Sequence, residues 1–316
     1  MSPATDPLRA KLSALRTTTS IDDVRAAAVA PNGILVAAAA KRIATGGPFA
    51  ALVDELPAAF ERLLDKPVKR DPTCAGKIAI ARTLYDLERW DPLFAVGARY
   101  VQLEPAYGKP VDTAGELRAI CGFAHAHFVR PDALDVLAEL LADSDLQTRI
   151  AAGRALGDNG TDGAAALLRF KLLTGDGDPD VLATCCESLL SIQKDDAIEL
   201  AARLLAGNDQ RAEVCAVALG ASRLPAGVAP LVAYCDSVLP DTRRRVAYLA
   251  LALTRAEPAT ARLCEVIATG DDADALAAAG ALSTFRDVPA VCDQVRAAAR
   301  RQPPKLRAKL DALMAA

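Results

Sequence analysis

The chain has 316 residues, of which 52% are hydrophobic and only 4% aromatic. This composition favours closely packed helices over a β-sheet, which needs more aromatic and β-branched side chains. The formal net charge of −3 weakens any function in which phosphate neutralisation supplies most of the affinity. The amino terminus has no apolar signal core, and no run of 18 apolar residues occurs. We therefore expect a cytoplasmic protein without membrane contact.

Residues 1–31 predict two short helices that cap one end of a helical array. Residues 32–142 follow as degenerate helical hairpins, the first of which contains Pro57 in its second helix. Because proline lacks an N–H and clashes with the preceding turn, we expect a kink or a break there.

The next hairpin covers residues 73–102, and its second helix is expected at 93–102. Trp90, the only tryptophan in the chain, lies in the turn of this hairpin. Two interpretations of Trp90 remain open. Its indole either joins the ends of the two helices or forms an exposed anchor for a partner, since tryptophan is enriched at binding hot spots.

An insertion interrupts the period of the array after this hairpin. The step from Leu84 to His125 is 41 residues, whereas the step from His125 to Leu156 is 31. The extra residues lie in 103–112, and insertions in repeat arrays collect on one face that is often the binding face. The segment is either a recognition loop or a longer structural connection.

The polar and aromatic residues in and before this insertion are the candidate contacts for a partner. Arg99 and Gln102 are three residues apart, which places them on one face of the predicted helix. Two prolines and a glycine stiffen the insertion. Its projecting side chains are Glu104, Tyr107, Lys109 and Asp112. After it, Thr113 and Glu116 have the spacing of a capping box, which predicts a helix at 113–128.

Regular helical hairpins are predicted at residues 143–302, with a cap helix at 303–316. In the clearest copy, apolar residues recur at helical spacing on both sides of a turn at 157–162. The leucine that closes the first helix recurs at intervals of 30 to 33 residues, at Leu156, Leu189, Leu219, Leu251 and Leu282. An apolar partner lies twelve residues later in three copies, at Leu168, Leu231 and Leu263. Such a period indicates stacked units that cannot bury their apolar faces alone.

The repeating unit resembles the HEAT repeat, particularly the short alanine-rich variety of bacterial proteins and bilin-lyase accessory subunits. The resemblance is carried by an aspartate before the first helix, at Asp145, Asp178 and Asp241, and by the motif RIAAGRALG at 149–157 with its degenerate copy AEVCAVALG at 212–220. It implies a single right-handed α-solenoid of about eight hairpins over residues 1–316. HEAT-like arrays serve many roles, so the resemblance predicts fold better than function.

Of the eight cysteines, Cys121, Cys185 and Cys215 occupy the position that alanine holds in other repeats. We therefore expect buried, unreactive thiols rather than disulfides or a metal site. His125 and His127 are two residues apart on a predicted helix, so they point apart and cannot jointly bind a metal. No phosphate-binding, zinc-protease or nucleophile-elbow motif occurs. No catalytic residue, metal or cofactor is predicted.

Three functions remain after these considerations. The favoured hypothesis is a non-catalytic scaffold that binds a protein partner in a groove lined by the second helices, with contacts from Trp90, the insertion, Arg99, Gln102, Arg169 and Arg203. The first alternative is a nucleic-acid-binding protein similar to the HEAT-like DNA glycosylases, which the charge and the few aromatic residues disfavour. The second is an accessory chaperone or lyase subunit similar to the bilin lyases.

Overall fold

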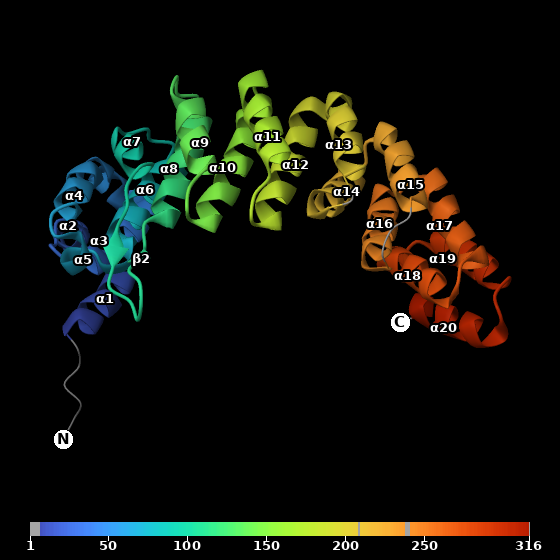
Figure 1. The fold of residues 1–316 in the computed structure, drawn as a ribbon. Helices are drawn as coiled ribbons and strands as arrows, with labels where there is room; N and C mark the ends of the chain where they lie inside the picture. The colour runs from blue at the N-terminus through green and yellow to red at the C-terminus, as the bar shows by residue number, and fades with distance from the viewer. Residues whose placement is uncertain (1–6, 208, 238–240, 316) are drawn as a thin grey trace. The chain divides into compact units, whose positions relative to one another are not determined.

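The computed structural model describes residues 7–207, 209–237 and 241–315. Within these ranges the regular structure is helical apart from one two-stranded hairpin (Figure 1), so the all-α class is confirmed. Contacts divide the chain into two compact units, residues 1–159 and 160–316. Residues 1–6 of the expected amino-terminal cap lie outside the described ranges.

The first unit begins with short helices and ends with longer ones. Its elements are α1 (Pro7–Thr17), α2 (Ile21–Ala28), α3 (Gly33–Ala44), the 3-10 helix η1 (Gly47–Glu55), α4 (Leu56–Leu63), α5 (Pro67–Arg70), η2 (Pro72–Cys74), α6 (Ala75–Asp86), α7 (Leu93–Gly97), β1 (Leu103–Glu104), β2 (Val111–Asp112), α8 (Gly115–His127), α9 (Ala133–Leu141) and α10 (Leu146–Asn159).

The second unit consists of α-helices joined by short turns and three 3-10 helices within the described residues. Its elements are α11 (Asp162–Thr174), α12 (Pro179–Gln193), η3 (Lys194–Ala197), α13 (Ile198–Leu205), α14 (Gln210–Ser222), η4 (Pro225–Gly227), α15 (Val228–Asp236), α16 (Asp241–Thr254), α17 (Glu257–Thr269), α18 (Asp272–Leu282), η5 (Ser283–Phe285), α19 (Pro289–Ala299) and α20 (Pro304–Ala315).

Within each unit, the first helices of successive hairpins pack against one another. In the first unit α3 contacts α6, α6 contacts α8, and α8 contacts α10. In the second unit the same order runs through α12, α14, α16 and α18. The second helices flank this row, as α9 does beside α8 and α10. Each hairpin therefore buries its apolar face mainly against its neighbours, as stacked repeats do.

The closing position of the first helix is buried in every copy, with an exposed fraction of at most 3%. It is filled by Leu84, His125 and Leu156 in the first unit and by Leu189, Leu219, Leu251 and Leu282 in the second. The second-helix leucines predicted twelve residues later, Leu168, Leu231 and Leu263, are all 0% exposed. The 30-residue register inferred from the sequence thus identifies core positions correctly.

The turn after the closing position also repeats. Four residues beyond it the backbone is left-handed in five hairpins, at Glu88 (φ 57), Val129 (φ 49), Gly160 (φ 68), Arg223 (φ 54) and Arg255 (φ 52). A left-handed residue directly after a helix lets following N–H groups reach the last free carbonyls. Glycine adopts this conformation without steric cost, whereas the other residue types strain the backbone.

Side-chain caps start several of the first helices. Asp178, Asp209 and Asp271 each accept a hydrogen bond from an N–H in the first turn of the helix that follows. These short polar side chains satisfy donors that have no partner inside the helix. Of the aspartates named in the repeat motif, Asp178 is thus a helix cap, and Asp145 likewise accepts from the Thr148 N–H at the start of α10.

Two local expectations differ in outcome. The break at Pro57 is confirmed, because η1 ends at Glu55 and α4 starts at Leu56 with Pro57 in its first turn. The helix expected at 93–102 is shorter than predicted and ends at Gly97. A Cβ at Gly97 would lie 2.5 Å from the Cys121 sulfur, so α7 packs very closely on α8 before the chain leaves the helix.

The cysteines form no disulfide bonds, and all but the half-buried Cys264 are buried. Burial raises the pKa of the Cys185 thiol to about 12, so this thiol carries almost no thiolate at neutral pH. The thiols of Cys186 and Cys215 lie 3.5 Å apart in a buried hydrogen bond. In the part of the chain that the structure describes, no helix has the length and apolarity needed to cross a bilayer.

The repeat register yields a test of the core. On α11, Leu168 is 0% exposed and Leu173 is 48% exposed, so Leu→Ala at the two positions removes the same atoms from opposite environments. We expect Leu168→Ala to lower the free energy of unfolding of the second unit by about 2–5 kcal/mol. Leu173→Ala should change it by less than about 0.5 kcal/mol. Urea denaturation followed by circular dichroism measures both, and equal losses would contradict the assigned register.

Candidate interaction site

The insertion at 103–112 folds as a β-hairpin, a structure that its sequence did not predict. Its strands pair in an antiparallel register that places Leu103 opposite Asp112. The Thr113 N–H extends the ladder by donating to the Gln102 carbonyl over 2.9 Å. Each strand has only two residues, and an isolated pair this short is not stable by itself. Side chains at the base must therefore hold the hairpin.

The Glu104 carboxylate is the first of these anchors. One of its oxygens accepts hydrogen bonds from the Thr73 N–H (2.6 Å), the Gln102 amide (2.7 Å) and the Thr113 hydroxyl (2.9 Å). Partial burial acts to raise the pKa of Glu104, but these hydrogen bonds and the nearby Lys77 charge outweigh it and the pKa is lowered. The ionised carboxylate thus joins the hairpin to the segment before α6.

Gln102 is buried at the foot of the hairpin, with an exposed fraction of 2%. Its amide donates to the Asp71 carbonyl over 2.8 Å, and its carbonyl oxygen accepts from the Tyr100 hydroxyl over 3.2 Å. The predicted placement of Gln102 on an exposed helix face is therefore wrong. The helix that would have exposed it ends at Gly97, so Gln102 instead satisfies polar groups inside the fold.

The Asp71 side chain forms a fully buried ion pair with Lys77. The two charged atoms are 2.8 Å apart, and both side chains are 0% exposed. The Asp71 carboxylate also accepts from the Gly76 N–H over 2.6 Å, which holds the start of α6. A buried charge is tolerated only when it is paired and hydrogen-bonded in this way.

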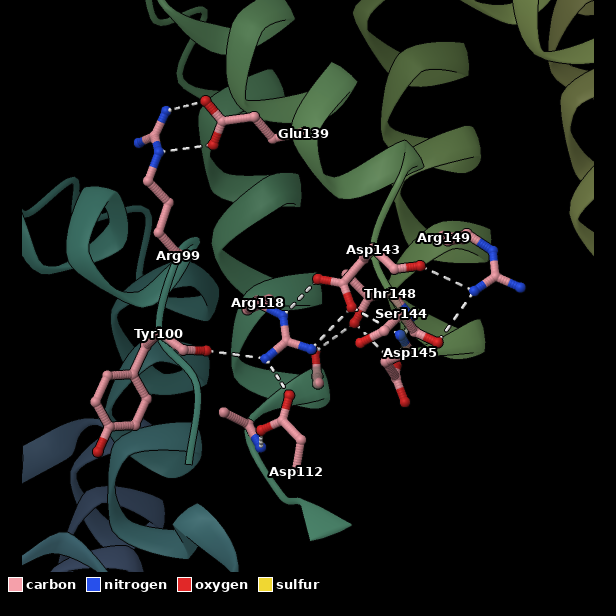
Figure 2. A network of polar contacts seen from close by, with 12 residues as sticks. Arg99, Tyr100, Asp112, Arg118, Glu139, Asp143, Ser144, Asp145, Thr148 and Arg149 are labelled. Carbon is pink, nitrogen blue, oxygen red and sulfur yellow. Dashed lines mark hydrogen bonds and ion pairs between the residues drawn. The ribbon is translucent and has the colours of Figure 1, made fainter. Parts of the chain in front are cut away.

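Arg118 of α8 connects the hairpin to the next turn of the array, as Figure 2 shows. Its guanidinium is 2.7 Å from the Asp112 carboxylate, forms two bonds of 2.7 and 2.9 Å with Asp143, and donates to the Tyr100 carbonyl over 2.9 Å. The side chain is only 3% exposed. A planar guanidinium can bind several acceptors at once, which a lysine ammonium cannot reproduce.

The Asp112 carboxylate also fixes backbone on both sides of the hairpin base. It accepts from the N–H groups of Gln102 (3.1 Å) and Ala114 (3.0 Å). Burial acts to raise the pKa of Asp112, but these bonds and Arg118 outweigh it and the pKa is lowered. The capping box expected from Thr113 and Glu116 does not form, because Ala114 is the residue at the helix cap and makes no side-chain bond there.

The same network continues into α10. Asp143 accepts from the Asp145 N–H over 2.7 Å, and Asp145 accepts from the Thr148 N–H over 2.8 Å at the start of that helix. Arg149 donates to the Asp143 carbonyl over 2.9 Å (Figure 2). The hairpin, α8 and α10 are therefore joined by continuous polar contacts within the first unit.

The hairpin exposes an apolar surface that includes its tip and one side chain on each face of the strand pair. Tyr107 at the tip has a relative exposure of 109%, while Leu103 is 58% and Val111 is 52% exposed. Between residues 105 and 111, Lys109 is the only charged residue. The flanking carboxylates of Glu104 and Asp112 are engaged in the base of the hairpin. This surface is suited to contact another apolar surface.

A groove of about 450 Å³ adjoins the base of the hairpin. Residues of α8 and α10 line it, including the buried Ile150 and Ala151 and the exposed Glu116 and Arg154. These two helices are the first helices of their hairpins. The groove beside the hairpin therefore lies on the first helices and not on the second helices, where the sequence analysis placed the binding groove.

The remaining predicted contacts do not gather at the hairpin. Arg99 forms a two-pronged ion pair with Glu139 of α9, with bonds of 2.7 and 2.9 Å. Arg169 donates to the Gln193 side chain over 2.7 Å, in the second unit. Arg203 is exposed on α13 of that unit.

Trp90 lies at the opposite end of α8 from the hairpin and is half-buried. Its ring packs 5.4 Å from Phe94, 5.1 Å from His125 and 5.8 Å from Phe128, measured between ring centroids. These contacts support the interpretation in which the indole joins helix ends. His125 is fully buried, and its Nδ1 lies 2.7 Å from the Cys121 carbonyl.

Sequence reasoning missed Arg118 and Asp143, the centre of the network. One signal was present: Lys77, Arg118 and Arg149 each stand seven residues before a closing position, and all three bind the segment that precedes a first helix. The repeat register could therefore have identified a recurring cation. One acceptor of Arg118, Asp112, stands only six residues before it, but the other carboxylate, Asp143, is 25 residues away and could not have been identified from local spacing.

No family model matches the chain, and a comparison with curated proteins finds no match. Function is therefore inferred from the geometry of the site.

The Glu104 contacts predict a pH dependence of stability. Because the folded-state pKa is lowered, the stabilisation is present above the unfolded-state value of about 4.3 and is lost as the pH falls through the folded value. Glu104→Gln keeps an oxygen acceptor but no charge, so its free energy of unfolding should fall less steeply than that of the wild type below about pH 5. Urea denaturation followed by Trp90 fluorescence reports on this unit.

Glu61→Gln is the matched control, since Glu61 is exposed on α4 and takes no part in the hairpin base. Its pH profile should follow the wild type. Identical profiles for wild type and Glu104→Gln would show that the Glu104 charge does not stabilise the first unit.

Proposed function

We propose that this protein is a non-catalytic interaction scaffold, and that the hairpin at 103–112 is its recognition element. The observation that carries the proposal is the contrast between the anchored polar side chains of the hairpin and its exposed apolar ones. Its base is fixed by Glu104, Asp112 and Arg118, while Leu103, Tyr107 and Val111 are exposed to solvent. Exposed apolar side chains on a preorganised element are characteristic of a binding surface.

The proposed architecture is a HEAT-like right-handed α-solenoid of about eight hairpins. The buried closing register, the recurring left-handed turn and the packing of successive first helices within each unit support it. Stacked repeats tolerate an insertion between two units because each unit contacts only its neighbours. The hairpin is such an insertion, and it can project without disturbing the packing of α6 against α8.

Preorganisation explains why a hairpin is useful for recognition. A flexible loop loses conformational entropy when a partner orders it, and this loss reduces affinity. Here charged hydrogen bonds already fix the two ends of the segment, so the ends lose their conformational entropy during folding and not on binding. Binding energy from Tyr107, the largest exposed side chain of the tip, then contributes directly to affinity.

The proposal predicts a selective effect at Tyr107. Replacing Tyr107 with a benzophenone amino acid should yield a specific cross-linked partner in the native cell. Tyr107→Ala should then weaken binding of that partner by about 1–3 kcal/mol, the range for an aromatic anchor. Helicity should be unchanged, because the side chain makes no buried contact. Binding is measured by calorimetry with the purified partner.

Phe170 supplies the control. It is an exposed aromatic residue, 65% exposed, on α11 of the second unit. Phe170→Ala should leave the affinity for that partner unchanged. Cross-links that form only from position 170, or equal losses from the two substitutions, would contradict a recognition role for the hairpin.

A further inference from the structure

A strained, exposed residue marks the turn between α8 and α9. Val129 has φ 49 and is 79% exposed. β-Branched side chains are disfavoured in left-handed backbone because the Cβ substituents crowd the adjacent carbonyl. Four other hairpins have glycine or a charged residue at this place in the turn, at Glu88, Gly160, Arg223 and Arg255. Val129 is the apolar exception.

Strained residues persist where the surrounding structure or a function favours them. Packing does not account for Val129, because most of its side chain is in solvent. The side chain is therefore available to contact a molecule outside the chain.

An oriented arginine lies next to Val129. The Arg130 guanidinium stands 4.5 Å from the centroid of the Trp90 ring, and that ring is held by Phe94, His125 and Phe128. The cation–π contact holds the guanidinium close to the indole. Among the described residues, no hydrogen bond or ion pair engages its N–H donors, and the residue is exposed. Arg130 is thus positioned and still able to bind an acceptor.

Nearby carboxylates restrict which acceptor fits. Glu88, whose side chain is 73% exposed, bonds to His127 over 3.0 Å. The Asp132 carboxylate is 50% exposed and 3.9 Å from the buried His125 ring. Arg89 is already paired with Asp54 over 2.6 Å. These negative groups at the same edge disfavour a polyanion such as a nucleic acid but leave room for one carboxylate at Arg130.

We propose that Val129, Arg130 and the exposed part of Trp90 form a second docking site, for a protein segment in which a carboxylate side chain adjoins an apolar one. The carboxylate accepts a two-pronged hydrogen bond from Arg130, and the apolar side chain packs on Val129 and the indole. The site is separate from the hairpin, because the 13 residues of α8 extend about 20 Å between them. Tryptophan and arginine are both enriched at binding hot spots.

Trp90 is the only tryptophan, so its fluorescence reports on this site in the full chain. The probe is an acetylated and amidated peptide with a single glutamate between leucines, and the matched peptide has glutamine in place of that glutamate. We expect the glutamate peptide to change the Trp90 emission saturably and the glutamine peptide to bind at least about tenfold more weakly. Equal binding of the two peptides would overturn the proposal.

Two substitutions separate docking from folding. Arg130→Gln should weaken the glutamate peptide at least about tenfold, whereas Arg255→Gln, which alters an arginine stacked 4.6 Å over Phe285 in the second unit, should have no effect. Val129→Gly should move the urea midpoint of the first unit upward because it relieves strain, yet weaken the peptide about threefold or more. Unchanged peptide affinity in Val129→Gly or Arg130→Gln would refute the site.

A further pair of probes tests whether the site binds a nucleic acid instead of a protein segment. Inorganic phosphate and a single-stranded oligonucleotide are titrated under the same conditions. Neither should displace the glutamate peptide at equal concentration. Displacement by the oligonucleotide would assign this edge to nucleic acid and overturn the proposal.

Discussion

The buried guanidinium of Arg118 is the interaction on which the arrangement of the first unit depends. It binds Asp112 at the hairpin, Asp143 before α10 and the carbonyl that follows α7. Removing a charge from water costs several kcal/mol, and the cost is recovered only when every donor finds a well-placed acceptor. The three acceptors come from three different segments. Their positions are therefore fixed together, and the hairpin cannot shift without leaving part of this charge unpaired.

The sequence was sufficient where structure depends on short-range periodicity. Helical spacing places Leu156 and Leu219 on the buried stripe, because an amphipathic helix must bury one face against its neighbours. Some turns could also be predicted, because helix capping and left-handed backbone depend on neighbouring residues. Asp178 and Gly160 take up the capping and left-handed positions that their side chains, or the lack of one, favour. The HEAT-like resemblance stays a hypothesis, since periodic burial is shared by many helical repeats.

The candidate site was only partly predictable, because its contacts are long-range. The position of the insertion could be found from the broken period, but two-residue strands have no period of their own. Gln102 was assigned to a helix surface, whereas α7 ends at Gly97 and turns its amide inward. The side chains of Arg118 and Lys77 resemble solvated helix residues in sequence. Only the fold shows that carboxylates from other segments meet them.

The departures from the repeat concentrate around one helix, α8. It follows the inserted hairpin, carries Arg118, has His125 where other hairpins have leucine, and ends next to the strained Val129. A repeat in a stacked array must satisfy only its neighbours, so one hairpin can accept polar and strained residues if its packing on both sides is kept. The α8 helix keeps that packing against α6 and α10. The inserted hairpin before α8 and the exposed, strained Val129 after it therefore leave the packing of the array intact.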